Sequence, residues 1–398
     1  MTQTGNIPFF MPTKIVSGQG GLARCGALAQ SIGMAKPLVV TDAVIAKQDF
    51  CKFVVQAIEE AGLRYELFED CAVDARLQQA ESLAGLCRRK GLDGVLAIGG
   101  GSVMCCGKAT AISAVNEGSL RDYAFPRLAP RHPLPTLMIP TTAGSGVEVS
   151  QFSVLKDEEL HEKLIVGGAS CFPTLALLDP ATLASLPKAL AAASAVDALC
   201  HALEAYFSSL ATPLTDSIAI GSAKTLYNCM RKSVLDRDLD AQADNLLASS
   251  MANIACGNAR LGLGHALSDP LESHLDVPHT VGVSVLLPRV VAFCAEAAPA
   301  KATIVAQALG GVPGQRDPID HIRRSLFDLY DDLGLRKSFS LEQLPLEKAS
   351  AIAALAVPGL YGGMVPHSID NETLINSPAL RSMTVKQARE CLLACLSE

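Results

Sequence analysis

Histidine and carboxylate side chains are concentrated in the short stretch Gly262–Thr280 (GLGHALSDPLESHLDVPHT), whereas the chain as a whole is largely apolar. Side chains of these types bind divalent metal ions. His265 and His279 would lie about 21 Å apart along a straight helix. Pro270 and Pro278 argue against one continuous helix, and a break would allow the chain to fold back and bring the two imidazoles together. Pro278 also predicts that a helix begins at His279.

A second pair of this kind is Asp197 and His201 in the sequence SAVDALCHALEAY. Their spacing puts both side chains on one face of a helix, which suits two metal ligands. Taken alone, the pair is better explained by a buried Asp–His hydrogen bond, a common structural device. Together with His265 and His279 it predicts an Asp-His-His-His site for a borderline divalent ion, for which Fe(II) and Zn(II) both fit and Mn(II) fits less well.

A glycine-rich segment, IGGGSVMCCGKA (Ile98–Ala109), follows a buried strand. Three glycines allow a backbone to approach a pyrophosphate, while a serine and the following helix N-terminus present N–H donors to it. The alternative is a turn that opens a helix without binding a ligand. The candidate phosphate-binding residues are Gly99, Gly100, Gly101 and Ser102.

Two further segments have similar features. Ser17–Ala23 (SGQGGLA) fits G-x-G-x-x-A, and Asp42 ends the next strand as in a dinucleotide-binding fingerprint, although a tight turn into a helix is the simpler interpretation of so loose a match. Ile139–Ser150 follows another strand and lacks the spacing of a P-loop or of a G-x-S-x-G elbow, which disfavours phosphoryl transfer and serine hydrolysis. It offers the hydroxyls of Thr141, Thr142 and Ser145.

The elements that must position these residues divide the chain in two. β-Rich runs alternate with helical ones in the first half, which predicts a doubly wound parallel sheet with helices on its faces. From about Pro180 onward only helical patterns remain, so the second domain should be all-α. We place the boundary within Leu177–Pro187, with Asp179 as a cap, which gives domains of residues 1–182 and 183–398. The predicted strands lie in Lys36–Asp42, Arg64–Asp70, Asp93–Ser102 and Pro135–Thr142.

Composition narrows the possible partners and the compartment. The net charge of −7 leaves no strong basic field, which excludes nucleic acid and anionic membranes as expected partners. No apolar stretch reaches the roughly 20 residues that span a bilayer, and the N-terminus lacks the pattern of a signal peptide, so a cytoplasmic location is expected. The thirteen cysteines never form a CxxC pair and should be buried, reduced thiols.

Four sequence blocks in this order resemble the iron-containing (group III) alcohol dehydrogenase family over nearly the whole chain: GGGS-x5-K, PTTAGSG-x-E, D-x3-H-A-x-E-x-Y, and a G-H-A followed by P-H. The resemblance implies an N-terminal NAD-binding α/β domain and a C-terminal helical, metal-binding domain. It implies Fe(II) as the favoured metal, with Zn(II) as the alternative. The implied metal ligands are Asp197, His201, His265 and His279.

The resemblance also assigns the cofactor contacts. It puts the pyrophosphate loop at Gly99–Ser102 and further contacts at Thr141, Thr142 and Ser145. Lys163, in EKLIV, matches a lysine near the nicotinamide end. Asp42 would accept hydrogen bonds from the ribose 2′-hydroxyl and repel a 2′-phosphate, which favours NAD over NADP.

Three positions depart from the family pattern. Cys105 stands where an aspartate is usual, Asp269 where many members have a histidine, and VDAR (Val73–Arg76) where PNPT is common. In those family members the resemblance puts this histidine near the nicotinamide, where it would relay a proton. Asp269 is therefore the candidate catalytic residue for that role, although a carboxylate serves it near neutrality only with a raised pKa. The alternative interpretation is that Asp269 is only an N-terminal helix or turn residue ahead of Pro270.

The implied reaction is hydride transfer between NAD(H) and a small primary alcohol or aldehyde, as in enzymes of class EC 1.1.1. The polar side chains of Asp269, Glu272, His274 and Asp276 suggest a polar or anionic substrate. The alternatives are a dehydroquinate synthase-like relative that uses NAD only transiently, and a catalytically impaired binding subunit. The resemblance favours a homodimer or higher homo-oligomer, for which the β-rich segment Ile7–Gly18 could pair across a two-fold axis.

Overall fold

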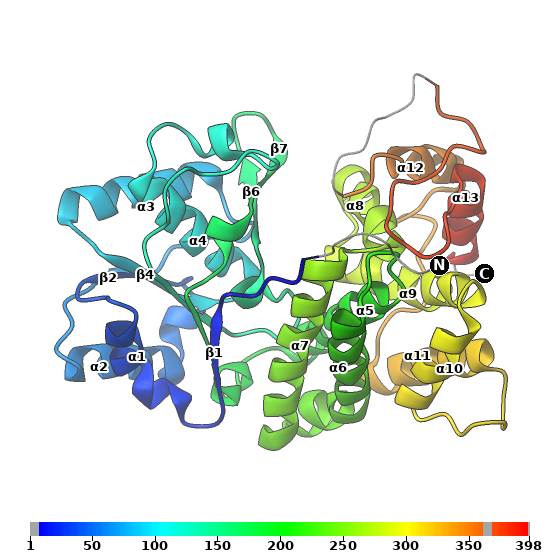
Figure 1. Ribbon diagram of the computed structural model, residues 1–398, viewed down its shortest axis with the longest axis horizontal. Coiled ribbons are helices and arrows are strands. Elements are labelled where there is room, and N and C mark those ends of the chain that lie inside the picture. The colour runs from blue at the N-terminus through cyan, green and yellow to red at the C-terminus, as the bar shows by residue number, and fades with distance from the viewer. Residues whose placement is uncertain (1–7, 361–367, 397–398) are drawn as a thin grey trace. The chain divides into compact units, whose positions relative to one another are not determined.

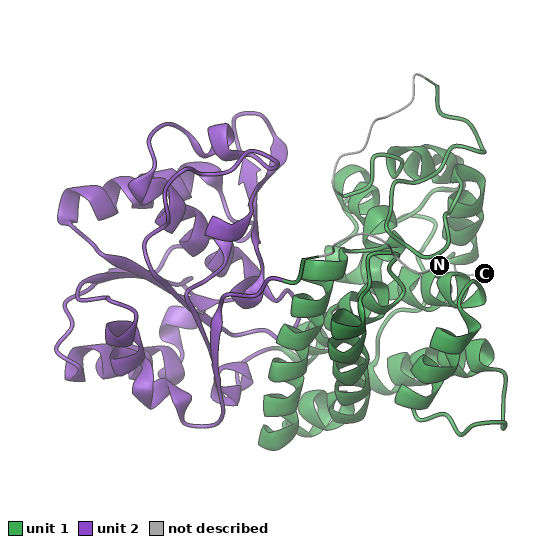
Figure 2. Cartoon of the chain, in the orientation of Figure 1, with its two compact units in different colours: residues 1–9, 187–398 green, residues 10–186 purple. Residues whose placement is uncertain are grey.

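The computed structural model describes residues 8–360 and 368–396. The chain forms two compact units, shown in different colours in Figure 2. Residues 10–186 form one, which we call the α/β unit, and the described residues from Pro187 onward form the other, the helical unit, together with Pro8 and Phe9. The boundary expected from the sequence, between residues 182 and 183, falls inside the short 3-10 helix η6 (Pro180–Leu183).

A six-stranded sheet is the centre of the α/β unit. Its order is β1-β8-β5-β4-β2-β3, and every neighbouring pair is parallel. All four predicted strands are present, but β8 was not predicted, because a four-residue apolar run next to Asp179 has too little length to show a period. The strands are β1 (Lys14–Ser17), β2 (Pro37–Val40), β3 (Glu66–Phe68), β4 (Gly94–Gly99), β5 (Thr136–Pro140) and β8 (Leu175–Leu178).

Helices cover both faces of this sheet, α1 and α2 on one face and α3 and α4 on the other (Figure 1). Successive strand residues point to opposite faces, so the strands are apolar on both sides. In β4, Leu96 packs in the core with α1 and α2, whereas Val95 and Ala97 pack in the core with α3 and α4. The predicted doubly wound sheet is thereby confirmed. These helices are α1 (Cys25–Ser31), α2 (Asp49–Glu60), α3 (Leu77–Lys90) and α4 (Gly101–Val115).

The first glycine-rich segment is a tight turn into a helix. Gly18 and Gly20 have φ of 134° and 78°, a region open to glycine, and a 3-10 turn and α1 follow. The backbone N–H of Leu22 donates to Oδ2 of Asp179 at 3.0 Å. A carboxylate of the protein therefore binds where a phosphate would bind in a dinucleotide fingerprint. Asp179 also caps η6 through the N–H of Ala181, as predicted.

An antiparallel hairpin, β6 (Phe152–Asp157) and β7 (Glu162–Gly167), was not predicted. It carries Lys163 on its exposed part, opposite Lys156. Arg121, from the 3-10 helix η3 (Leu120–Tyr123), holds the hairpin by a two-pronged ion pair with Asp157, at 2.5 and 2.8 Å. The same guanidinium contacts Glu159 at 2.6 Å.

Beyond Pro187 the described residues form helices, with strand pairing limited to isolated bridges, as predicted for an all-α domain. Pro270 lies inside a helix, so the expectation that it would break the chain there was wrong. The break comes instead at Asp276 (φ 50°) and Pro278, and a helix does begin at His279. The helices are α5 (Lys188–Tyr206), α6 (Pro213–Arg231), α7 (Leu239–Ala259), α8 (Leu263–Leu275), α9 (His279–Glu296), α10 (Pro299–Ala308), α11 (Pro318–Leu333), α12 (Ala349–Leu355) and α13 (Val385–Ala394), with a π-helical turn η7 (Lys232–Asp236) after α6.

Among the described residues, α9 has the length and composition of a membrane span, but 67% of it is buried inside the protein, as in a core helix. All thirteen cysteines are free thiols, and twelve of them are buried, as expected from their spacing. Of the segment Ile7–Gly18, Ile7 lies outside the described residues, and Lys14–Ser17 alone forms a strand, at one edge of the sheet.

The ion pair of Arg121 with Asp157 predicts a pH-dependent stability. Arg121 holds the pKa of Asp157 well below its usual range. Because the folded-state pKa is the lower one, the stabilisation is complete above the pKa of an unfolded aspartate, about 4, and is lost as the pH falls further. Asp157→Asn should therefore lower the melting temperature at neutral pH, and the gap to the wild type should close below about pH 4.

Thermal melts of both proteins across this pH range measure the gap. Glu159→Gln is the control, since Glu159 is a more exposed partner of the same arginine and should have a smaller effect. A gap that stays constant with pH would show that Asp157 acts through packing and not through its charge.

Candidate functional site

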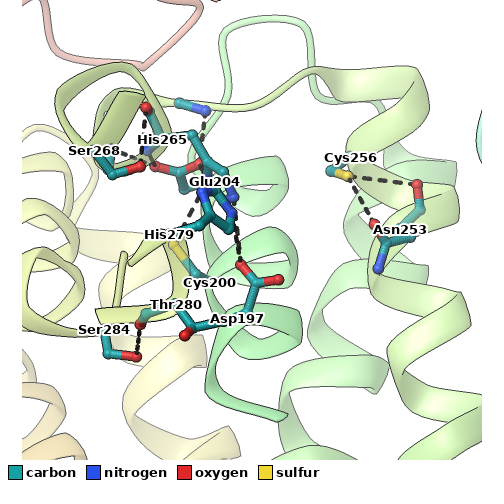
Figure 3. Close-up of polar contacts among 12 residues, drawn as sticks. Asp197, Cys200, Glu204, Asn253, Cys256, His265, Ser268, His279, Thr280 and Ser284 are labelled. Atoms are coloured by element: carbon teal, nitrogen blue, oxygen red, sulfur yellow. Dashed lines mark hydrogen bonds and ion pairs between the residues drawn. The ribbon is translucent and has the colours of Figure 1, made fainter. Parts of the chain in front are cut away.

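Four side chains of metal-binding type come from three helices of the helical unit. Asp197 and His201 lie one turn apart on α5, His265 lies in the first turn of α8, and His279 is the first residue of α9. Figure 3 shows Asp197, His265 and His279 turned toward one another. Oδ1 of Asp197 lies 3.5 Å from Nε2 of His265 and 3.7 Å from Nε2 of His279. The ring of His201 stacks on that of His265, with 4.6 Å between centroids.

These distances fit a shared metal ion. Two ligand atoms each about 2.1 Å from a metal, at a tetrahedral angle, lie about 3.4 Å apart. The ligand atoms of Asp197, His265 and His279 all lie within 4.8 Å of one another. Oδ1 of Asp197, Nε2 of His265 and Nδ1 of His201 are buried without a hydrogen-bond partner, which is costly unless another group satisfies them. One carboxylate and imidazole nitrogens are the donor set of a borderline divalent cation.

Electrostatics show how tightly this cluster is coupled. Burial raises the pKa of Asp197, but the surrounding imidazoles outweigh burial and hold that pKa well below its usual value. Burial lowers the pKa of His201 to about 4. Burial also opposes protonation of His265 and His279, yet their carboxylate neighbours raise the pKa of these residues to about 9 and about 10. A bound cation would therefore take the place of protons on these two rings.

Each of these two imidazoles has a carboxylate behind it. Nδ1 of His265 lies 2.7 Å from Oε2 of Glu204, and Nδ1 of His279 lies 3.4 Å from Oε2 of Glu272. Such carboxylates orient the histidine ligands of metals. Glu204, for which no role was predicted, stands three residues after His201 on the same helix face.

The second glycine-rich segment opens α4 in the α/β unit. β4 ends at Gly99, Gly100 is the N-cap, and α4 begins at Gly101 with no side-chain cap. The N–H of Thr141, just after β5, donates to the carbonyl of Gly99 at 3.0 Å. A Cβ added to Gly101 would lie 3.1 Å from Oγ of Ser145, and this Oγ is buried without a hydrogen-bond partner. Uncapped N–H groups next to a free hydroxyl are suited to a phosphate.

The neighbouring residues complete this loop. Thr142 approaches Gly100, with 3.6 Å between its Cγ2 and a Cβ built on that glycine. Oγ of Ser102 accepts the N–H of Asp74 at 3.2 Å, so the VDAR segment contacts the glycine-rich loop. Cys105 is buried in the hydrophobic core that α3 and α4 share. A thiol at this position therefore packs as an apolar side chain.

The loop lies at the point where the sheet reverses its order. The chain leaves β2 toward β3 on one side and leaves β4 toward β5 on the other, although β2 and β4 are neighbours. Ligands of open α/β sheets bind outside the carboxyl ends of such strands. Asp42, just after β2, is half-buried, and its Oδ1 accepts the N–H groups of Val44 and Ile45, both at 2.9 Å.

Other residues singled out in the sequence lie at the surface of their unit. Lys163 is exposed on β7. Asp269 is exposed on α8, one turn after His265, inside the helix and not at its start. His274 is also exposed, in the last turn of α8.

Lys108, the lysine of the GGGS-x5-K block, is a buried cation for which no role was predicted. It lies on α4, and its ammonium group donates to the backbone carbonyls of Val147, Ser150 and Phe152, at 3.2, 2.8 and 2.6 Å. Three acceptors satisfy all three N–H donors. The segment that follows Ser145 is thereby tied to the helix that begins at Gly101.

Comparison with known proteins gives the class of this chain. It is 32% identical to the NAD-dependent methanol dehydrogenase of Bacillus methanolicus over 76% of this chain and 80% of that enzyme. It is 31% identical to choline dehydrogenase of Bacillus subtilis (strain 168) over 82% of this chain and 83% of that enzyme. The structure of a 1,3-propanediol oxidoreductase superposes with a TM-score of 0.90 at 26% identity, covering 98% of this chain and 100% of that one.

A sulfoacetaldehyde reductase from Bifidobacterium kashiwanohense, solved with NAD+, shares the fold with a TM-score of 0.87 at 24% identity, over 99% of each chain. These matches define a metal-dependent oxidoreductase that uses NAD. The chain belongs to the iron-containing alcohol dehydrogenase family, whose first domain matches residues 12–180 and whose C-terminal domain matches residues 191–376. The predicted family, fold and alcohol oxidoreductase class are confirmed, and nothing supports the transient-redox or impaired-subunit alternatives.

The contacts of Lys108 predict a specific loss of stability. Lys108→Met should reduce the free energy of unfolding by on the order of 3 kcal/mol, because three buried carbonyls lose a charged donor. The shift of the urea midpoint of the α/β unit measures this. Lys52→Met, at an exposed lysine of α2 in the same unit, is the matched control and should shift the midpoint little. Equal shifts in the two variants would contradict the assignment.

Proposed function

We propose that Asp197, His201, His265 and His279 together bind one Fe(II) ion, with Zn(II) as the alternative, in an alcohol dehydrogenase that works with NAD. The observation that carries this proposal is the convergence of buried, unpartnered donor atoms on Asp197 and His265. The bound ion would supply Lewis-acid polarisation of the substrate oxygen, and NAD would exchange the hydride. His201, which burial keeps neutral, needs to lose no proton before it can act as a ligand.

We propose that the start of α4 binds the pyrophosphate of NAD through Gly99, Gly100, Gly101 and Ser102. The uncapped helix N-terminus and the unpartnered hydroxyl of Ser145 support this assignment. Thr141 and Thr142 line the same loop end. Asp42 has one carboxylate oxygen engaged with backbone N–H groups and would use the other for the ribose hydroxyl. Lys163 is proposed for the nicotinamide end.

We propose that Asp269 carries the alcohol proton to water. It lies four residues after His265, on the same side of α8, and is exposed. Exposure allows direct proton exchange with water, but Asp269 lacks the burial that would strengthen a carboxylate as a base near neutrality.

The proposed substrate is a small primary alcohol that carries a second polar group, or its aldehyde. Asp269 and Asp276 are exposed near the ends of the segment that joins His265 to His279. Glu272, between them, is half-buried and faces His279. Carboxylates of one sign repel an anion. Of the polar or anionic substrates expected from the sequence, the neutral polar ones are therefore favoured.

The substrate class predicts a ranking. Steady-state kcat/KM should be higher for propane-1,3-diol than for propan-1-ol, and higher than for the anion 3-hydroxypropanoate by about tenfold or more, the cost of one unfavourable charge contact of about 1.4 kcal/mol. These three substrates have chains of equal length and differ at one end. A clear preference for propan-1-ol would exclude a polar pocket, and a preference for the anion would reverse the charge argument.

We further propose a homodimer or higher homo-oligomer in the cytoplasm. β1 forms an edge of the sheet, where its backbone can pair with a second copy across a two-fold axis. Thirteen free cysteines are typical of a reducing compartment.

Metal removal tests the central proposal. The purified chain should contain near-stoichiometric iron or zinc, a chelator should lower its melting temperature, and Fe(II) should restore it. His265→Ala should lose both the metal and NADH formation from alcohol, whereas His274→Ala, at an exposed histidine of the same helix, should keep both. Metal content and NADH absorbance measure the two effects.

Each contrary outcome has a distinct meaning. Bound metal and NAD without net NADH would indicate transient redox chemistry in place of dehydrogenation. No metal in the wild type would mean that the four side chains form a structural cluster.

A further inference from the structure

We propose that Glu204 is a positioning residue for the metal centre, because it fixes the orientation and tautomer of His265 and ties the start of α8 to α5. This inference rests on the proposed metal site. Glu204 is buried at the C-terminal half of α5, seven residues after Asp197. It is not among the four proposed ligands.

Glu204 accepts hydrogen bonds from four donors of one short segment. Its Oε2 accepts the N–H of Gly262 at 2.8 Å and faces Nδ1 of His265 at 2.7 Å. Its Oε1 accepts the N–H of Gly264 at 2.5 Å and that of His265 at 3.3 Å. Helix α8 has no side-chain cap of its own at Gly262. A carboxylate from another helix therefore caps α8, where the helix dipole favours a negative charge.

The carboxylate decides which nitrogen of His265 carries the proton. An ionised carboxylate only accepts hydrogen bonds, so Nδ1 must be the donor. In the neutral ring the lone pair is then on Nε2, the atom that lies 3.5 Å from Oδ1 of Asp197. A ligand nitrogen needs this lone pair, and a carboxylate behind the ring makes the nitrogen more basic.

The glycines of the G-L-G-H sequence permit this close approach. A Cβ added to Gly264 would lie 2.7 Å from Oε1 of Glu204, and one added to Gly262 would lie 3.2 Å from Cδ of Glu204. Any larger residue at 264 would push the carboxylate away from the N–H groups that it accepts. Gly264 is thus part of the same arrangement.

The carboxylate behind His279 provides a comparison within the same site. Glu272 faces Nδ1 of His279 at 3.4 Å, and 41% of the His279 side chain and 30% of the Glu272 side chain are exposed. Water can replace a partner that is exposed to this extent. We therefore expect the metal to depend on Glu204 more than on Glu272.

The experiment measures Co(II) affinity of the full-length, metal-depleted chain by competition with a chromophoric chelator. Glu204→Gln keeps the size of the side chain but presents an amide that can donate to Nδ1 and shift the proton to Nε2. Its Kd for Co(II) should rise by about 10- to 100-fold, and the Co(II) absorption spectrum should change. Glu272→Gln should raise the Kd by about threefold or less, because solvent compensates.

Gly264→Ala is the second variant, since it retains Glu204 and displaces its carboxylate. Its Co(II) affinity should also fall, and its spectrum should change in the same direction. In the Zn(II)-loaded wild type, ¹⁵N NMR of labelled histidine should show His265 with its proton on Nδ1. This measurement needs no substitution and holds even if Glu204→Gln fails to fold.

Three results would overturn the inference. One is Glu204→Gln with wild-type Kd and spectrum but a lower melting temperature, which would make Glu204 a helix cap only. Another is equal loss of affinity in Glu204→Gln and Glu272→Gln. The last is a His265 proton on Nε2. A wild-type chain that binds no Co(II), Zn(II) or Fe(II) is a different result, since it rejects the metal site itself.

Discussion

The buried carboxylate of Asp197 is the charge on which the arrangement of the helical unit depends. A carboxylate without water costs several kcal/mol unless cations or donors compensate for it. Here the compensation comes from imidazoles on α5, α8 and α9, so three helices must meet at one point. Because those rings in turn need acceptors, further carboxylates lie behind them at Glu204 and Glu272. Going outward from Asp197, a carboxylate is followed by imidazoles and then by further carboxylates.

The two units are prepared for ligands of opposite charge. The helical unit gathers carboxylates and imidazoles, which suit a cation. The α/β unit offers an uncapped helix N-terminus and an unpartnered serine hydroxyl, which suit an anion. The first glycine-rich turn differs from the second, because the N–H of Leu22 in that turn already donates to the carboxylate of Asp179. A metal-dependent dehydrogenase requires both kinds of site, one for the substrate oxygen and one for the pyrophosphate of NAD.

Packing explains why these sites hold their geometry. α5 is buried along most of its length and is rich in alanine, so α6, α7 and α9 can pack closely around the helix that carries Asp197 and Glu204. In the α/β unit, β4 is buried on both faces and ends directly at the glycine loop. Both sites are therefore attached to a deeply buried element of their unit.

The sequence by itself determined the local features of this protein. Strand and helix periods gave the sheet and the helical second half, and residue types gave Asp197, the histidines and the glycine loop, because period and chemistry are properties of neighbouring residues. Asp197, His265 and His279 do converge, although the spacing alone left a simple Asp–His hydrogen bond open for the pair on α5. Local patterns could not decide that Pro270 would stay inside α8, since the surrounding contacts decide whether a helix tolerates a proline.

Only the tertiary structure assigned partners to the buried charges. Glu204 acquires its role from N–H groups 58 to 61 residues away, and Lys108 from carbonyls 39 to 44 residues away. In the sequence, Glu204 and Lys108 each appear only as one charged residue within a motif. The physical reason is that a buried charge is defined by what surrounds it in space, and the chain brings those groups together only when it folds.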